Sequence, residues 1–253
     1  QFLQTIELSG MTLNIKKFKF AQKEVKFCGQ IVGKGFRRPD PEKVSAVEGI
    51  KIPTTKTEVR QVCGFFSYFR DHIKDYAEIA KPLTDLTTKR VPERIPWGER
   101  EQQAFDKLKL LLVNATKERL HIIDIRRPFN LSVDASDYAI GGVLSQIGEG
   151  GKENPVAFSS MKLSSAQRAW ATVEKEAFAV IAALRKFRGW VFGSKITVYS
   201  DHNPLTYLTL SAPKSAKLMR WALALQEFDI EFRFRSGKTN VAADTLSRLG
   251  PDV

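Results

Sequence analysis

The pattern of apolar and polar residues changes near residue 129, after which strand-like and helix-like segments follow one another. Short runs rich in β-branched and aromatic residues, such as FNLSV and KITVY, predict strands, and apolar residues at helical spacing predict helices. The expected strands cover 129–134, 139–146, 155–159, 196–200 and 230–235, and the expected helices cover 165–187, 215–228 and 241–249. This order favours a mixed sheet with helices on its faces.

The first part of the chain is expected to contain short strands followed by helices. Thr55 and Glu58 have the spacing of a capping box, which predicts the start of an amphipathic helix behind them. The stretch GKGFRRPDP predicts a turn-rich exit from the strands. The other expected segments are a helix ending at Gly10, strands around Lys16–Phe20 and Val25–Val32, a helix over Glu99–Val113 and a connector over Thr116–Pro128.

Charge points to a polyanionic partner. The formal net charge is +12, and residues 1–40 alone carry eight basic and three acidic groups. No basic amphipathic helix with a clean apolar face accompanies this excess, so nucleic acid is a better candidate than a membrane surface. The two cysteines, Cys28 and Cys63, lie in apolar settings and indicate a reduced compartment rather than a disulfide framework.

Four carboxylates lie in contexts that place them at the ends of strands and early in helices. They are Asp134 in LSVDAS, Glu176 in TVEKEAF, Asp201 in TVYSDHN and Asp244 in VAADTL. Two carboxylates about 5 Å apart repel by about 3 kcal/mol at an effective dielectric of ~20, so such a cluster favours divalent cations. The sequence therefore predicts metal-assisted phosphodiester hydrolysis, with four unrelated surface acids as the alternative.

Helical geometry separates Glu174 from Glu176, the two candidates in VEKEAF. Residues two positions apart lie about 200° apart around a helix, so only one of them can face a given site. Glu176 falls on the edge of the apolar stripe beside Ala179 and Ala183, whose small side chains allow a sheet to approach. Glu174 falls on the other edge beside Arg185, where an ordinary surface ion pair is available. The geometry favours Glu176.

Long segments of this chain resemble the reverse transcriptase region of gypsy-like LTR retroelement polyproteins. The RNase H part is carried by VDASDYAIGGVLSQ, SSAQRAWATVEKEAFAVIAAL, VYSDHNPLTYL and RWALALQEFDIEFRFRSGKTNVAADTLSR. The preceding part is carried by VKFCGQIVGKGFRRPDPEKVSAV and TKTEVRQVCGFFSYFRDHIKDYAEIAKPLTDL. The resemblance implies an α/β (α+β) fold: an RNase H-like mixed five-stranded sheet with flanking helices, preceded by a partial palm and a helical thumb/connection.

The resemblance also implies domain boundaries and an activity. Residues 1–40 would form the end of the palm with primer-grip-like strands, 41–127 the thumb/connection, and 128–253 the RNase H domain. The implied reaction is cleavage of the RNA strand of RNA–DNA hybrids with two Mg²⁺ ions, for which Mn²⁺ can substitute. Asp134 would bridge both ions, and Glu176, Asp201 and Asp244 would complete their shells.

The implied partners are an RNA–DNA hybrid, a template-primer duplex and the rest of the polyprotein, with no membrane. The implied location is intracellular, in a cytoplasmic virus-like particle or the nucleus. The expected nucleic-acid contacts are Phe27, Cys28, Gly29, His202, Arg235, Lys238 and Asn240. For the first three, an ordinary core strand with a turn remains an equal alternative. For His202, packing or capping at the start of NPLTYL is the alternative.

Two departures from the family pattern limit the expected activity. The loop RFRSGKTN lacks the histidine that many RNases H carry there, which puts the turnover rate in doubt. No two aspartates are adjacent anywhere in the chain, and it begins at Gln1 without a methionine, so we expect a fragment without polymerase chemistry. The rival functions are a non-catalytic nucleic-acid-binding or scaffolding fragment and another metal nuclease such as a transposase, which the spacing from Glu176 to Asp201 disfavours.

Overall fold

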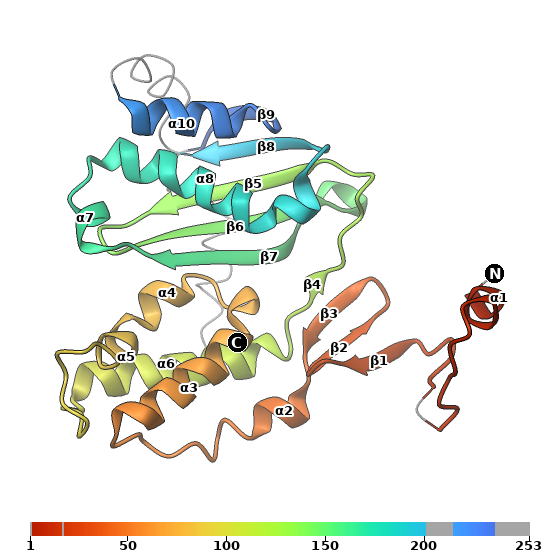
Figure 1. Ribbon diagram of the computed structural model, residues 1–253, viewed down its shortest axis with the longest axis horizontal. Coiled ribbons are helices and arrows are strands. Elements are labelled where there is room, and N and C mark those ends of the chain that lie inside the picture. Colours follow the sequence, from red (N-terminus) through yellow and green to blue (C-terminus); the bar gives the residue numbers. More distant parts are fainter. Residues whose placement is uncertain (1, 17, 201–214, 236–253) are drawn as a thin grey trace.

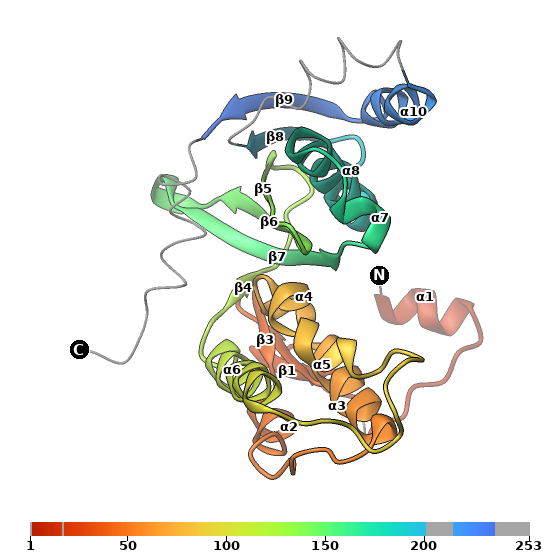
Figure 2. The ribbon, with the colours of Figure 1, turned by 90° about the vertical axis from the view of Figure 1, so that its left-hand side faces the viewer.

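The computed structural model describes residues 2–16, 18–200 and 215–235, which fold around two main hydrophobic cores (Figure 1). One core fills a unit built on a five-stranded sheet. The other fills a mainly helical unit that precedes it in the chain. Figure 2 shows the two units stacked, with β7 of the sheet unit above α4 of the helical unit.

The sheet unit has the strand order β7-β6-β5-β8-β9. Strands β7, β6 and β5 pair antiparallel, whereas β5, β8 and β9 pair parallel. Alternation along β5 sends Phe129, Leu131 and Val133 into the core beneath α8. The elements of this unit are β5 (Phe129–Ala135), β6 (Ala139–Ile147), η2 (Glu149–Gly151), β7 (Glu153–Lys162), α7 (Ser165–Arg168), α8 (Thr172–Val191), β8 (Lys195–Ser200), α10 (Ala216–Leu225) and β9 (Asp229–Phe234).

The helical unit contains a small antiparallel sheet of order β1-β2-β3-β4. Its core is made by apolar faces of α3 and α6, with Phe66 and Phe105 packed edge to face. The elements are α1 (Phe2–Leu8), β1 (Glu24–Phe27), β2 (Gln30–Gly33), β3 (Phe36–Pro39), α2 (Pro41–Ser45), α3 (Lys56–Tyr68), η1 (Arg70–His72), α4 (Tyr76–Ile79), α5 (Lys81–Asp85), α6 (Glu99–Ala115) and β4 (Leu120–His121).

The predicted mixed sheet with flanking helices is confirmed, and so are several local signals. The capping box is present: the amide of Glu58 donates to the Thr55 hydroxyl, and the Glu58 carboxylate accepts from the Thr55 amide. Helix α6 begins at Glu99 as expected and continues two residues beyond Val113. Gly10 follows the end of α1 with a positive φ of 67°, which suits a glycine.

The strand expected around Lys16–Phe20 is wrong. The described residues of this segment form no strand and are all exposed. The alternation of Phe18 and Phe20 with lysines is the pattern of a half-buried strand, but a strand also needs a neighbour to accept its backbone hydrogen bonds. The edge strand β1 begins only at Glu24 and pairs with β2. The segment therefore has the residue pattern of a strand, but no described strand pairs with it.

Three other boundaries differ from the prediction. The supposed turn-rich exit contains β3, and the supposed connector contains β4, which pair with each other through Phe36 and His121. The helix expected over 165–187 is divided into α7 and α8 because Ala171 is extended (φ −60°, ψ 151°). This turn lets the Trp170 ring pack against Phe178 and Trp221. The helix expected over 241–249 lies outside the described residues.

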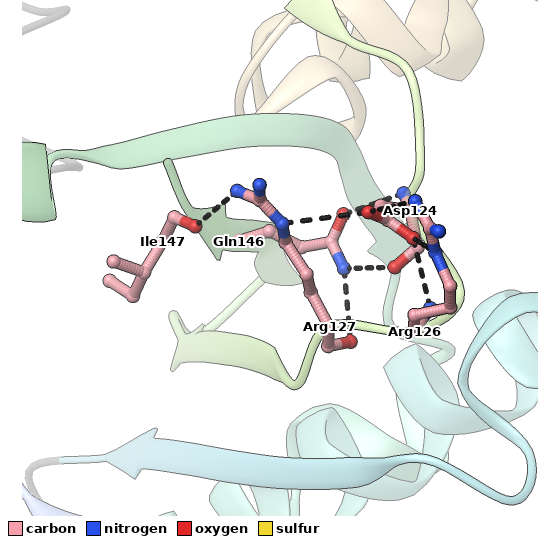
Figure 3. Close-up of polar contacts among 5 residues, drawn as sticks. All are labelled: Asp124, Arg126, Arg127, Gln146 and Ile147. Carbon is pink, nitrogen blue, oxygen red and sulfur yellow. Dashed lines mark hydrogen bonds and ion pairs between the residues drawn. The ribbon is translucent and has the colours of Figure 1, made fainter. Parts of the chain in front are cut away.

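The two units are joined by polar contacts and by the connector. The Arg37 guanidinium donates to the Val156 carbonyl at 3.0 Å, and the Ala77 amide donates to the Ser160 hydroxyl at 2.8 Å. The buried Gln146 amide side chain accepts from the Asp124 amide and donates to the carbonyls of Asp124 and Arg127 (Figure 3). These contacts fix the connector to the end of β6 and so fix where β5 begins.

Among the described residues, no helix combines the length and the apolar character that crossing a membrane requires.

Candidate active site

Asp134 is the next-to-last residue of β5 and is exposed. Its neighbour Val133 points into the core beneath α8, so Asp134 points to the opposite face of the sheet. Across the antiparallel ladder it pairs with Gly141 of β6. A β-carbon built on Gly141 would lie 2.8 Å from Oδ1 of Asp75, which places the Asp75 carboxylate on the same face. Gly141 is therefore needed for this close approach.

Asp75 reaches this face from the loop before α4 and has a left-handed backbone (φ 52°, ψ 28°). Its pKa is raised above the usual aspartate value, chiefly by burial. The charge of Asp134 raises this pKa further, while Lys74 opposes the shift. A small polar cleft beside it is lined by Asp75, Glu78, Asp134 and Ser160, among others. Two carboxylates from different units thus repel each other at the end of β5.

Glu176 lies near the start of α8 and is 2% exposed. Helix α8 covers the face of the sheet opposite Asp134, where the Ala183 β-carbon would lie 3.4 Å from a β-carbon built on Gly142. Ala179 and Ala183 are buried beside Glu176, as the helical phase predicted. Glu174 instead pairs with Lys217 of α10 at 2.7 Å between Oε1 and Nζ. The two glutamates therefore occupy different surroundings, although the partner of Glu174 is Lys217 and not a neighbour on its own helix.

The structure places the two candidate acids it describes, Asp134 and Glu176, at one end of the sheet. The carboxyl ends of β5 and β8 and the amino end of α8 lie on the same side of the sheet unit (Figure 1). Ser200, the last residue of β8, is buried, and Asp201 follows it. Asp201 and Asp244 lie outside the described residues, as do His202, Lys238 and Asn240. In the described part of the chain, no three His, Cys, Asp or Glu side chains form a group that could hold a metal.

The two described acids nevertheless have the right chemistry for a hard cation. Asp134 offers carboxylate oxygens at an open end of the sheet, and no cysteine or histidine ligand accompanies it among the residues lining its cleft. Oxygen-only donors are what Mg²⁺ and Mn²⁺ prefer. The donor set therefore fits a divalent cation, with Asp134 as its exposed member.

The turn after Asp134 is held by side chains that the sequence only partly indicated. The Ser136 hydroxyl accepts from the amide of Ala139, which closes the turn. Asp137 pairs with the buried Lys175 at 2.9 Å between Oδ1 and Nζ. This contact lowers the pKa of Asp137, first through the hydrogen bond and then through the charge of Lys175. Asp75 and Glu78 gave no sequence signal, because only tertiary packing brings them to Asp134.

The expected contacts in VKFCGQIV lie on a hairpin. Cys28 and Gly29 form the turn between β1 and β2 with φ values of 46° and 69°. Phe27 is 67% exposed on an edge strand, so the alternative of an ordinary core strand is wrong. The Tyr68 hydroxyl of α3 donates to the Cys28 carbonyl, and its ring lies 3.4 Å from a β-carbon built on Gly29. Helix α3 therefore fixes the turn while leaving the Phe27 ring accessible.

Arg235 is engaged within the sheet unit. Its guanidinium lies 3.7 Å from the centroid of the Tyr199 ring, and Nη1 lies 3.4 Å from a Glu153 carboxylate oxygen. Its amide donates to the Ser200 carbonyl at 3.0 Å, which continues the pairing of β8 with the chain after β9. Arg235 thus ties the end of β8, where the candidate acids are expected, to β7.

Comparison with known proteins agrees with the fold. Residues 124–228 match the RNase H-like domain found in reverse transcriptase. The chain is 36% identical over 263 residues to the retrovirus-related Pol polyprotein from transposon opus of Drosophila melanogaster, covering 99% of this chain and 26% of that polyprotein. It is 34% identical over 250 residues to the corresponding polyprotein from transposon gypsy of the same species, covering 95% of this chain and 24% of that polyprotein.

Two solved structures share the fold at low sequence identity. The foamy viral protease-reverse transcriptase dRH in complex with double-stranded DNA superposes with a TM-score of 0.76 at 21% identity, covering 100% of this chain and 42% of that one. The foamy viral protease-reverse transcriptase in complex with RNA/DNA hybrid gives 0.75 at 22% identity, covering 94% of this chain and 32% of that one.

Residues 124–228 are an RNase H-like domain of the reverse transcriptase type. The chain is similar over nearly its whole length to gypsy-type retrotransposon Pol polyproteins, which confirms the resemblance inferred from its motifs. It spans about a quarter of the length of the opus and gypsy polyproteins.

Proposed function

We propose that this chain is the RNase H part of a retrotransposon reverse transcriptase and cleaves the RNA strand of RNA–DNA hybrids. The observation that carries the proposal is the position of Asp134 and Glu176 at one end of an RNase H-like sheet, where Asp201 follows β8 in sequence. The foamy viral enzyme of the same fold has been captured with an RNA/DNA hybrid, which supports a hybrid as the substrate.

The proposed domain roles follow the order of the chain. Residues 1–40 are the end of the palm, 41–127 the thumb/connection and 128–253 the RNase H domain. The parent polyprotein is an RNA-directed DNA polymerase in this proposal, and the template-primer duplex and the remaining polyprotein are its partners. This chain contains no pair of adjacent aspartates, so polymerisation is assigned to other parts of the polyprotein.

The proposed site is completed by divalent cations. Asp134, Glu176, Asp201 and Asp244 are the residues that would hold two Mg²⁺ ions, or Mn²⁺ in their place. When bound, such ions activate the attacking water and stabilise the charge on the leaving 3′ oxygen. The chain contributes the geometry: β5 and Gly141 fix the backbone of Asp134, and the buried face of α8 fixes Glu176. Two ligands that the fold already holds would spare the reaction part of the cost of gathering four mutually repelling carboxylates.

Substrate contacts are proposed on both units. The exposed Phe27 ring offers a surface on which a base or sugar can pack, and the pinned turn at Cys28 and Gly29 lets a nucleic-acid backbone approach closely. His202, Lys238 and Asn240 are proposed contacts near the acids, and Arg235 is proposed to act there mainly by positioning the end of β8, because its guanidinium already has protein partners.

The test is cleavage of a labelled RNA–DNA hybrid by the purified chain, with Mg²⁺ and with EDTA. Asp134→Asn should reduce the single-turnover rate at least ~1000-fold, about 4 kcal/mol of barrier. Its hybrid affinity in EDTA should stay within about threefold of wild type, because phosphate contacts dominate affinity. Asp137→Asn, three residues away on the same turn, is the matched control and should keep most of the rate. Phe27→Ala should weaken binding with little effect on the rate at saturation.

Wild-type protein that binds the hybrid but never cleaves it in Mg²⁺ or Mn²⁺ would support the rival function, a non-catalytic nucleic-acid-binding fragment. Equal rates for Asp134→Asn and wild type would remove Asp134 from the site.

A further inference from the structure

An exposed tyrosine close to Asp134 has cations from both units near its ring. Tyr138 lies in the turn between β5 and β6, four residues after Asp134, and is 44% exposed. Nζ of Lys81 lies 3.7 Å from the centroid of its ring, and Cζ of Arg168 lies 5.8 Å from it. Lys81 begins α5 of the helical unit, whereas Arg168 ends α7 of the sheet unit.

The charges of these two cations are not neutralised by the protein groups that the structure describes. Among the described residues, neither Lys81 nor Arg168 has a carboxylate oxygen within 4.0 Å of a side-chain nitrogen. Two lysines nearby differ in this respect, since Lys162 pairs with Asp85 and Lys175 pairs with Asp137. Lys81 and Arg168 therefore retain the charge that an incoming anion needs.

The positions of Lys81 and of the Tyr138 turn are fixed. The α4–α5 segment is attached to the edge strand β7 by the hydrogen bond from the Ala77 amide to the Ser160 hydroxyl and by the Lys162–Asp85 ion pair. The Ser136 hydroxyl accepts from the amide of Ala139 and so closes the turn that carries Tyr138. A cation over an aromatic ring is held only weakly at an exposed site, so the ring orients Lys81 without neutralising it.

We propose that Lys81, Tyr138 and Arg168 form a binding site for a backbone phosphate of the nucleic acid, next to the acids that would cleave it. This inference rests on the proposed function for its substrate, the RNA–DNA hybrid. Lys81 and Arg168 bind the phosphate, and the tyrosine ring packs against the adjoining sugar. The site exists only when the helical unit is docked on the sheet unit, so the helical unit positions the substrate for cleavage as well as binding it.

The acidic face explains why such a site is needed. Asp75, Glu78 and Asp134 line one cleft, and their charges repel a polyanionic backbone. Glu78, three residues before Lys81, and Ala139, the residue after Tyr138, both line this cleft. The cations over the Tyr138 ring offset the repulsion for one phosphate only. The hybrid is thereby held in one register relative to Asp134.

The test uses the full chain and compares variants that each remove one positive charge from the helical unit. Lys81→Met should lower hybrid affinity in EDTA about 3- to 10-fold near 0.1 M salt, and should reduce the slope of log K against log salt by about 0.7–0.9, the value for one lost phosphate contact. Lys89→Met removes the same charge from an exposed lysine that follows α5, and should change affinity less than twofold. Lys81→Arg should restore most of the affinity.

Two further measurements separate positioning from general electrostatics. In Mg²⁺, Lys81→Met should lower kcat as well as raise KM, because loss of the register leaves less of the bound hybrid aligned with Asp134. In a double-mutant cycle, Lys81→Met and Tyr138→Leu should be less than additive in binding, because each removes part of one site. Equal effects of Lys81→Met and Lys89→Met, or full additivity with Tyr138→Leu, would overturn the proposal. Wild type that binds without cleaving would overturn the proposed function alone, since the affinity comparison in EDTA needs no catalysis.

Discussion

The first turns of α8 bury Glu176 and the single turn η1 buries His72, and these two burials differ in kind. Glu176 of α8 is 2% exposed and lies at the end of the sheet where β5 and β8 finish. His72 of η1 is 6% exposed and lies where η1 packs against β7, in the joint between the two units. Within the part of the chain that the structure describes, Nε2 of His72 has no hydrogen-bond partner.

The contrast teaches that burial alone does not identify a catalytic group. Burial lowers the pKa of His72 to about 4, with a further contribution from the charge of Arg37 and an opposing one from Asp71. The imidazole is therefore neutral at pH 7, and its burial there includes no cost of desolvating a charge. Glu176 has another carboxylate, Asp134, at the same end of the sheet, and Asp201 follows β8 there in the sequence. The position of Glu176 relative to other acids is what distinguishes it from His72.

The largest expected effect concerns His72 and acid. Its pKa is about 4 in the folded protein, against an ordinary value of 6.5, so the unfolded chain binds more protons between these values. The free energy of unfolding has its full value above pH 6.5. It decreases as the pH drops from 6.5 towards 4, by up to about 3 kcal/mol. His72→Leu should flatten this loss when urea unfolding is followed from pH 7.5 to 4.5.

His121 provides the matched control for that series. Burial also lowers its pKa, with a contribution from Lys152, but it is only partly buried. His121→Gln should therefore preserve most of the acid sensitivity. A pH dependence that is identical in wild type and His72→Leu would show that other groups cause it.

The next effect is expected in the first turns of α8. Glu176→Gln should slow single-turnover cleavage at least ~100-fold, about 2.7 kcal/mol of barrier, because a neutral amide is a poor ligand for a divalent cation. Glu174→Gln should cost less than ~5-fold, since Glu174 is already paired with Lys217. The reverse ranking would move the site to the other side of α8 and reopen the comparison with His72.

The sequence predicted the sheet unit well because its signals are local and repeated. Alternation in β5 and β6 and the helical spacing in α8 each encode which face is buried, so helical spacing alone distinguishes Glu176 from Glu174. The same logic failed at Lys16–Phe20, where alternation is present but no neighbouring strand exists among the described residues. The residue pattern shows which secondary structure a segment can form. The presence of a partner strand decides whether a strand forms.

Contacts between the units could not be predicted in the same way. Asp75 and Lys81 approach β5 and β6 across more than fifty residues of chain, and no periodicity links them to Asp134 or Tyr138. The turn at Cys28 is an intermediate case. Gly29 indicated a tight approach, but the tyrosine that pins the turn, Tyr68, belongs to a helix whose packing only the structure shows.

The smallest expected effect is on stability at the end of β5. Asp134 raises the pKa of Asp75, which means that the two carboxylates repel each other in the folded protein. Asp134→Asn removes this repulsion and should stabilise the chain in EDTA by about 1 kcal/mol, or roughly 2–4 °C in Tm for a chain of this size. Asp137→Asn should give no such gain, because Asp137 is paired with Lys175.

Saturating Mg²⁺ sharpens the same measurement. It should raise the Tm of wild type, since a ligand at 100 times its Kd contributes about 2.7 kcal/mol, and should have little effect on Asp134→Asn. His72→Leu, altered at the joint and not at the sheet end, should respond to Mg²⁺ as wild type does. If Mg²⁺ left wild type unchanged, or if Asp134→Asn melted below wild type in EDTA, the end of β5 would not be a site of concentrated negative charge, and Glu176 would be a buried structural group like His72.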